Sequence, residues 1–222
     1  MTPSPDATTS QPTAGHVPSL PPAGTGPITT VLLDADGVLQ IIGTPWVEAL
    51  TAVGGPEFCE RLLSEEGAGL AGRETMRDLI TRVRAETGAT TPVPDIEILW
   101  ERAVPDPGAW QVVRDLRAAG YRTVLATNQF WERRVWMRES LGYDGLCDVD
   151  AYSCSLGAAK PEAAYFTAAL KLAGARPEEA LFVDDSERNV VGEAALGIRT
   201  VHHPADGGDA ALRQEIIEAL TA

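Results

Sequence analysis

The amino-acid sequence predicts an α/β protein: a three-layer, Rossmann-like core around a parallel sheet, with a small α-helical cap inserted after the first strand. Short apolar runs alternate with single helical segments along most of the chain, and this alternation is typical of right-handed βαβ units. Polar residues directly follow several of the apolar runs, as expected at the carboxyl edge of such a sheet. Residues 44–104 interrupt the alternation near its start.

Each element of the core follows from local patterning. Residues 28–33 are apolar or β-branched and uncharged, as in a strand that is buried on both faces. Glycines after helical patterns and a proline at a helix start mark the boundaries of the later elements. The further predicted strands are residues 122–126, 149–153, 180–183 and 198–201. The predicted core helices are residues 107–119, 131–141, 161–172, 187–196 and 210–220.

The chain divides into three parts on the same grounds. We expect residues 28–43 and 105–222 to form the core, and residues 44–104 to form the cap, because the cap segment has helical patterns and no convincing strand. Its predicted helices are residues 46–53, 57–63, 74–85 and 96–102. Residues 1–27 hold seven of the sixteen prolines and few large apolar side chains. Such a segment buries too little surface to offset its ordering entropy, so we predict a disordered tail.

Composition restricts the class of partner. The formal net charge of −14 argues against a nucleic-acid backbone or an anionic membrane as the main partner. An anionic substrate remains possible, because a metal ion and a few basic residues can reverse the field locally. No apolar run approaches the roughly 20 residues of a membrane span. No lysine or arginine precedes Arg61, so we do not expect a secretory signal. Three cysteines without metal-type spacing indicate reduced, mostly structural thiols in a cytoplasmic protein. The sequence leaves open whether that protein is a monomer or a homodimer.

The most informative motif is Asp34-Ala35-Asp36-Gly37, which follows the first predicted strand. Two carboxylates at the end of a buried strand are costly unless a cation compensates their charge. Their spacing suggests two roles, since one carboxylate can attack while the other transfers a proton. Gly37 would let the backbone turn sharply beneath a bound group.

Three further motifs follow in order: Leu125-Ala126-Thr127-Asn128, Lys160-Pro161 and Leu181-Phe182-Val183-Asp184-Asp185-Ser186. Together with the first motif they resemble the haloacid dehalogenase-like (HAD) hydrolase superfamily, in its phosphatase and β-phosphoglucomutase-like branch with a helical cap. The resemblance runs from about residue 28 to about residue 203. It implies a helical cap that closes over the active site and shapes the substrate pocket.

The resemblance also implies roles for the motif residues. Asp34 would be the nucleophile that forms an aspartyl-phosphate, and Asp36 would be the general acid and base. Thr127 and Asn128, with the backbone near Gly37, would bind the oxygens of the transferring phosphoryl group. Lys160 would neutralise the nucleophile and the phosphate. This chain has sixteen arginines and only two lysines, and a compact ammonium suits a crowded site of carboxylates and phosphate.

The implied cofactor is Mg²⁺, which prefers carboxylate, carbonyl, water and phosphate oxygens. The protein ligands would be Asp34, the backbone carbonyl of Asp36, and one of the pair Asp184 and Asp185. We expect Asp185 to be the direct ligand and Asp184 to act through water or from outside the first shell, although the sequence leaves the choice open.

The expected reaction is Mg²⁺-dependent hydrolysis of a small phosphorylated metabolite. A sugar phosphomutase similar to β-phosphoglucomutase would use the same motifs and is an open alternative. A phospho-accepting receiver module is a remote alternative, because its acid pair comes first in the chain and its connections are short. A dehalogenase, which attacks carbon, lacks an acid at the position of Asp36. A binding protein with decayed catalysis has no support, since every motif residue is present.

Several other residues are weaker candidates. Arg73 in the cap could reach the substrate, and Trp131, Arg133 and Arg134 could line the rim of the pocket, although a packing or surface role is the simpler interpretation. The adjacent His202 and His203 point to opposite faces if extended, so they are unsuited to sharing one metal ion. We expect both to be loop or surface residues, and Lys171 to lie on a helix surface.

Overall fold

The computed structural model describes residues 18–194 and 196–222 of the chain. Its centre is a parallel five-stranded sheet with the strand order β5-β4-β1-β6-β7. The strands are β1 (Thr30–Leu33), β4 (Arg122–Thr127), β5 (Val149–Tyr152), β6 (Ala180–Asp184) and β7 (Arg199–His202). The predicted α/β fold with a parallel sheet is therefore confirmed.

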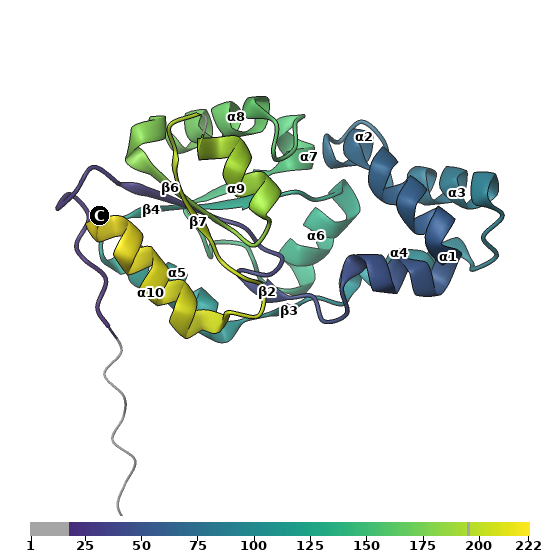
Figure 1. Cartoon of the computed structure of the whole chain (residues 1–222), viewed down its shortest axis with the longest axis horizontal. Coiled ribbons are helices and arrows are strands. Elements are labelled where there is room, and N and C mark those ends of the chain that lie inside the picture. Colours follow the sequence, from purple (N-terminus) through teal and green to yellow (C-terminus); the bar gives the residue numbers. More distant parts are fainter. Residues whose placement is uncertain (1–17, 195) are drawn as a thin grey trace, which may run out of the picture.

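Helices cover both faces of this sheet and complete the three layers (Figure 1). One face packs against α5 (Pro107–Ala118), α6 (Trp131–Ser140) and α10 (Gly208–Thr221), which share a hydrophobic cluster with Val31 and Leu33 of β1. The other face packs against α8 (Ala163–Ala173), whose cluster includes Leu32. Helix α9 (Glu187–Ala194) contacts β6 and β7. Alternate residues of β1 thus enter opposite cores, as a doubly covered strand requires.

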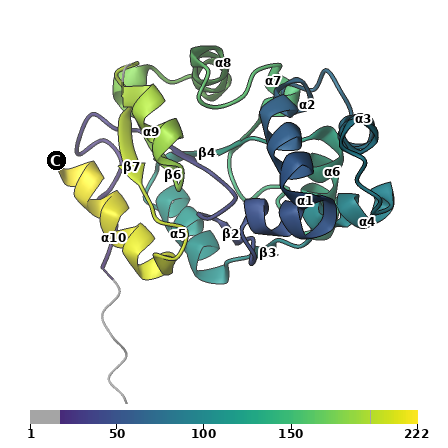
Figure 2. The ribbon, with the colours of Figure 1, turned by 45° about the vertical axis from the view of Figure 1, so that its right-hand side comes forward.

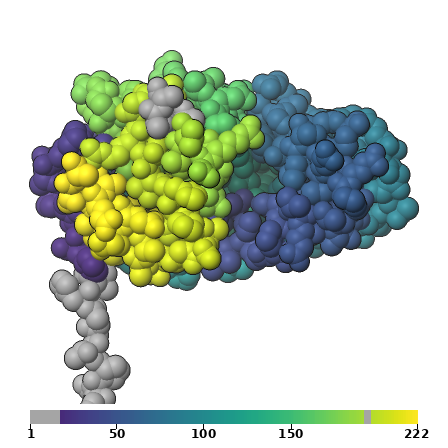
Figure 3. All heavy atoms as spheres, in the orientation of Figure 1, coloured from purple at the N-terminus to yellow at the C-terminus, as the bar shows by residue number. Residues whose placement is uncertain are grey.

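Residues 46–101 form the helical cap with a hydrophobic cluster of its own, which includes Leu50, Phe58, Leu62 and Trp100. Its helices are α1 (Trp46–Glu65), α2 (Gly67–Leu70), α3 (Met76–Thr87), α4 (Val93–Glu97) and the 3₁₀ helix η1 (Ile98–Glu101). Figure 2 shows the cap beside one edge of the core. In the space-filling view, a recess separates the blue cap from the yellow-green part of the core (Figure 3).

The chain enters and leaves the cap through a feature that the sequence did not predict. Strands β2 (Gln40–Ile41) and β3 (Val104–Pro105) pair antiparallel and form a two-stranded ribbon. The backbone N–H of Asp106 also donates to the carbonyl of Leu39 at 3.0 Å. These pairs are too short to leave a periodic hydrophobic signal, which is why pattern analysis missed them.

Other boundaries also differ from the prediction. The two helices expected at residues 46–53 and 57–63 are the two halves of α1, and the expected break between them is confirmed: Gly55 has the non-helical angles φ 83° and ψ 170°, and Pro56 follows. Proline removes a helix donor and is a common cause of such kinks. Helix α8 begins at Ala163 rather than at residue 161. The short helices α7 (Ser153–Leu156) and η2 (Pro177–Glu179) were not predicted.

Part of the predicted tail packs against the core. Residues 1–17 lie outside the described residues. Leu20 and Ala23 pack onto the cluster beneath α5 and α10, and the Ala23 N–H donates to the Ala119 carbonyl at 2.8 Å. The expectation of a tail through residue 27 therefore differs from the structure over residues 18–27. A few apolar contacts and a backbone hydrogen bond position this proline-rich stretch without regular secondary structure.

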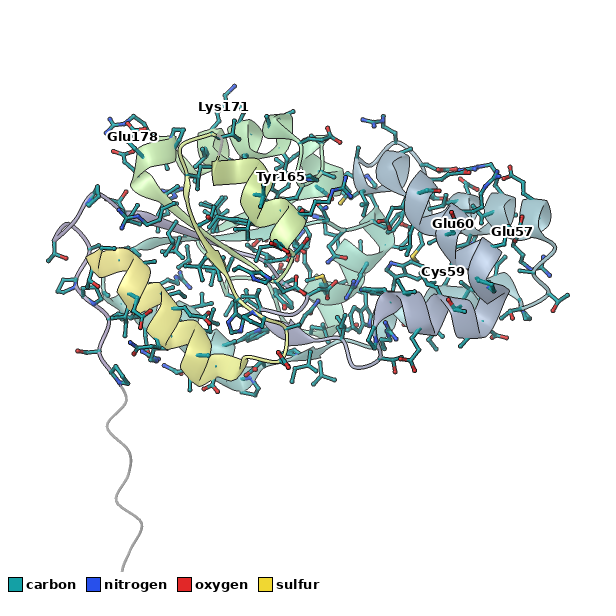
Figure 4. The ribbon with its side chains drawn as sticks, viewed as in Figure 1. Glu57, Cys59, Glu60, Tyr165, Lys171 and Glu178 are labelled. Atoms are coloured by element: carbon teal, nitrogen blue, oxygen red, sulfur yellow. The ribbon has the colours of Figure 1, made fainter. Side chains whose placement is uncertain are left out.

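All three cysteines are buried with free thiols, and Figure 4 shows Cys59 within the cap. Lys171 projects from α8 at the surface, as expected (Figure 4). Within residues 18–194 and 196–222, the helices lack the combination of length and apolar character needed to cross a bilayer.

Candidate active site

The motif residues meet at the carboxyl edge of the sheet. Asp34 directly follows β1, Thr127 is the last residue of β4, and Asp184 is the last residue of β6. Because β1 lies between β4 and β6, the ends of these three parallel strands are neighbours. The prediction that the motifs gather at one edge is thus met by the topology.

A buried ion-pair cluster lies at the centre of this edge. The Lys160 Nζ is 2.9 Å from Asp34 Oδ1 and 2.5 Å from Asp184 Oδ2. The side chains of Lys160 and Asp184 are 1% and 0% exposed, and that of Asp34 is 10% exposed. The Lys160 ammonium therefore links the end of β1 to the end of β6 through charge-assisted contacts.

This cluster holds more negative than positive charge, and the pKa values reflect it. Burial raises the pKa of Asp34 to about 8; Lys160 opposes that shift, while Asp184, Asp185 and Asp36 add to it. Burial lowers the pKa of Lys160, but Asp34 and Asp184 outweigh this effect, so its pKa is raised overall. Lys160 therefore stays charged. Its single positive charge is too small to keep all the neighbouring carboxylates ionised at once, so they need a further cation.

The acids fit a divalent cation bound by oxygen ligands. Asp34, Asp184 and Asp185 each offer a carboxylate oxygen, and these atoms lie within 4.8 Å of one another. Gly37 has φ of +78°, and a Cβ atom there would overlap the Asp185 carboxylate. Glycine is thus needed here both for the backbone conformation and for the space that Asp185 occupies. An all-oxygen set of this kind suits Mg²⁺.

The two acids after β6 have different surroundings. Both oxygens of Asp184 accept hydrogen bonds: Lys160 donates to one, the Ser186 backbone N–H to the other at 2.8 Å, and the Asn189 amide to both. Asp185 is less buried and faces Gly37. Its pKa is raised to about 6, chiefly by burial and then by Asp184. The better exposed lone pairs of Asp185 favour it as the direct metal ligand.

Asp36 is tied to a side chain that the sequence offered only as a rim candidate. Arg133, which is 3% exposed, donates to both carboxylate oxygens of Asp36 at 2.7 Å. Gln40 also donates to Asp36 at 2.6 Å, and Tyr143 donates to Gln40 at 3.0 Å. Arg133 is therefore a buried partner of Asp36 rather than a surface residue. The i, i+4 spacing of Asp36 and Gln40 was a signal that sequence analysis did not use.

Thr127 and Asn128 follow the same strand but have different contacts. Thr127 is 1% exposed, and its hydroxyl accepts from the Gln129 amide at 3.0 Å. The Asn128 amide donates to the Lys160 carbonyl at 2.9 Å and its oxygen accepts from the Lys160 N–H at 2.8 Å. The Asn128 side chain thus fixes the loop that carries Lys160, although it was expected to bind phosphate oxygens.

The weaker candidates also differ from one another in their exposure and contacts. Arg73 is exposed and donates to the Gly157 carbonyl at 3.2 Å, which joins the cap to α7. Trp131 is 42% exposed, and Arg134 lies over its ring. His202 is exposed at the end of β7 and contacts the Asp185 carbonyl, as Figure 1 places β7 beside β6. His203 lies in the loop after β7, as expected, but it is buried rather than at the surface: it is 2% exposed and bonded to Glu215.

Two cavities lie between this site and the cap. The smaller, about 160 Å³, is lined by Asp36, Arg133, Gln129 and cap residues that include Trp46 and Trp100. The larger, about 680 Å³, is lined by Lys160, Asn128, Arg188 and the residues that join α1 to α2. Leaving groups of a substrate held at Asp34 would extend into this space.

Known proteins resemble this chain in sequence and in fold. A phosphoglycolate phosphatase of Caulobacter vibrioides is 24% identical over 181 residues, which is 76% of each protein. A HAD family enzyme of Bacteroides thetaiotaomicron, solved as a magnesium complex, has a TM-score of 0.66 and 24% identity over 81% of this chain and 94% of its own. An L-2-haloacid dehalogenase of Xanthobacter autotrophicus has a TM-score of 0.59 and 19% identity over 78% of this chain and 76% of its own.

The family model for haloacid dehalogenase-like hydrolases matches residues 28–197. That range contains all four motifs, the whole cap and four of the five strands of the sheet. The chain belongs to the haloacid dehalogenase-like hydrolase family.

Proposed function

We propose that this protein is a Mg²⁺-dependent phosphatase that removes phosphate from a small phosphorylated metabolite through an aspartyl-phosphate on Asp34. The observation that carries the proposal is the buried contact of 2.9 Å between Asp34 and Lys160 beside the acids after β6. The similarity to the Caulobacter phosphoglycolate phosphatase and to the Bacteroides enzyme solved as a magnesium complex agrees with it. The free thiols are compatible with the cytoplasm as the proposed compartment.

In this reaction Asp34 attacks phosphorus, and the bond to the leaving oxygen breaks. Lys160 offsets the charge of the nucleophile and of the incoming phosphate. The Thr127 hydroxyl lies at the adjacent strand end, where it can donate to a phosphoryl oxygen. Asp34, Asp185 and the Asp36 carbonyl would hold Mg²⁺, with Asp184 behind them. When bound, the metal would supply positive charge that stabilises the phosphoryl group during its transfer.

Asp36 would protonate the leaving oxygen and then take a proton from the water that hydrolyses the intermediate. In the structure both of its oxygens accept from Arg133. Each oxygen of Asp36 thus already holds a donor nitrogen of Arg133, which occupies the place that a transferable proton would take. Proton donation therefore requires Asp36 to release at least one nitrogen of Arg133 when a substrate binds.

The test is phosphate release from a panel of phosphorylated metabolites and an aryl phosphate, with Mg²⁺ or with EDTA. We expect metal-dependent release by the wild type and a loss of at least about 1,000-fold in Asp34→Asn, since the nucleophile is removed. Asp144→Asn is the matched control, because Asp144 pairs with Arg138 on the surface. Full activity in Asp34→Asn would overturn the assignment of Asp34. Isomerisation of a sugar phosphate with little phosphate release would indicate a mutase.

A further inference from the structure

One cap residue lies at the junction of both cavities. Glu66 connects α1 to α2 and lines the 160 Å³ cavity together with Asp36, and the 680 Å³ cavity together with Lys160. The residues that line both cavities are Trp46, Leu63, Glu66, Leu70 and Asn128. Glu66 is the charged residue among those that line both cavities, so its charge acts on a group bound in either one.

The carboxylate of Glu66 has no partner within the part of the chain that the structure describes. It is half-buried and makes no hydrogen bond or ion pair with any described side chain or N–H group. The neighbouring Glu65, in contrast, pairs with Arg61 at 2.8 Å and with Arg82. Burial raises the pKa of Glu66 to about 7, and the charge of Arg188 opposes that shift. Glu66 is therefore ionised at about pH 8 and above, which is the pH at which the substrate comparisons below are made. A carboxylate that is desolvated and unpaired gains free energy from any donor brought to it.

The nearby cations are unable to reverse this preference within the smaller cavity. Both terminal nitrogens of Arg133 already bond to Asp36. Arg102 lies over the ring of Trp46 and lines neither cavity. Arg188 lines the larger cavity but not the smaller one. Because Arg133 offsets the charge of Asp36, a leaving group that carries a carboxylate into the smaller cavity would meet the uncompensated charge of Glu66, at a cost in Coulomb repulsion and desolvation.

We infer that Glu66 selects phosphomonoesters whose leaving group presents a hydrogen-bond donor, a hydroxyl or an ammonium, to the cap, and that it rejects leaving groups that carry a carboxylate. The inference rests on the proposed function and narrows its substrate class. It predicts that this protein discriminates against phosphoglycolate, the substrate for which the Caulobacter relative is named, because glycolate carries a carboxylate.

Matched substrates test it. Glucose 6-phosphate, glucosamine 6-phosphate and 6-phosphogluconate differ in the hydroxyl, ammonium or carboxylate that they present, and 2-hydroxyethyl phosphate, phosphoethanolamine and phosphoglycolate form a shorter set. We expect wild-type kcat/KM to favour the first two members of at least one set over the third by about 10- to 100-fold, as for a hydrogen bond to a charged group. The ratio between the first two separates hydroxyl from ammonium recognition.

Glu66→Gln should reduce the ratio of kcat/KM between the uncarboxylated and the carboxylated members by about tenfold or more, because the negative charge is lost while the shape of the side chain remains. Glu65→Gln is the matched control, as it removes one charge from the adjacent residue, whose ion pairs lie away from the cavities. It should leave the ratios unchanged. Equal narrowing in both variants, or a wild type that prefers the carboxylated members, would overturn the inference while leaving the phosphatase assignment intact.

A binding measurement separates the two proposals. Calorimetric Kd values for the same compounds in Asp34→Asn, with and without Glu66→Gln, require no turnover. We expect the carboxylated members to bind most weakly, and Glu66→Gln to reduce that difference in Kd, even if the wild type releases no phosphate from any of the compounds. Absence of binding by every member of both sets, or an order of affinities that Glu66→Gln leaves unchanged, would overturn it.

Discussion

Gly37 shows how one residue serves both the backbone and the site. It adopts φ of +78°, and a Cβ atom would overlap the Asp185 carboxylate. Gly43 has a similar φ of +70° with nothing near its missing Cβ. We expect Gly37→Ala and Gly43→Ala each to lose about 1–2 kcal/mol of unfolding free energy from the left-handed backbone. We expect Gly37→Ala alone to weaken Mg²⁺ binding, by tenfold or more, because Asp185 is displaced. Calorimetry with Mg²⁺ checks this, and equal affinity in both variants would contradict it.

Most residues at the centre of the site could be predicted, because chemistry and position coincide in the sequence. Asp34, Thr127 and Asp184 each end a strand, and Lys160 is one of only two lysines. Arg133 and Glu66 could not be assigned in this way. Arg133 is one of sixteen arginines, and its pairing with Asp36 depends on how α6 packs beside the end of β1. Glu66 gains its importance from the placement of the cap, which has no motif.

At the scale of elements, a capping side chain marks the start of α3, which the sequence pattern placed two residues too early, at residue 74. Thr75 precedes α3, and its hydroxyl accepts from the Asp78 N–H at 3.0 Å. Thr75→Ala should therefore lower the free energy of unfolding by about 1 kcal/mol, as for other N-caps. Thr167→Ala is the control, because Thr167 is an exposed residue inside α8. It should be neutral or slightly stabilising, since alanine has the higher helix propensity. Urea titration of both variants checks the difference, and equal effects would exclude capping as the cause.

Elements without such signals were missed or misplaced. The β2–β3 ribbon has two residues per strand, which is too few for periodicity. The break expected between two cap helices is present at Gly55 and Pro56, but the angle between the two halves of α1 could not be read from the sequence. Both features decide where the cap lies over the core, and hence where Glu66 and Trp46 meet the site. The cavity was therefore the part of the site furthest from prediction.

For the whole molecule, alternation of strands and helices was enough to predict the parallel sheet and its two covering layers. The strand order follows less directly, since β1 lies between β4 and β6, which are distant from each other in sequence. This order brings Asp34 and Asp184 into contact with one lysine, Lys160, with Asp185 beside them. The fold thus concentrates negative charge at a single edge, and a cation bound there should act on the stability of the entire domain.

That coupling predicts how stability depends on pH and Mg²⁺. Burial raises the pKa of Asp34 to about 8 and that of Asp185 to about 6, from 3.8. Between about pH 4 and 8 the folded chain then binds more protons than the unfolded chain, so its unfolding free energy falls as pH rises through this window. A bound cation offsets the charge that appears there. We expect Mg²⁺ to raise Tm more near pH 8 than near pH 5, and Asp185→Asn to reduce this difference while Asp144→Asn leaves it unchanged. Thermal denaturation at both pH values, with Mg²⁺ or EDTA, checks this; a rise independent of pH would show that the cation binds elsewhere.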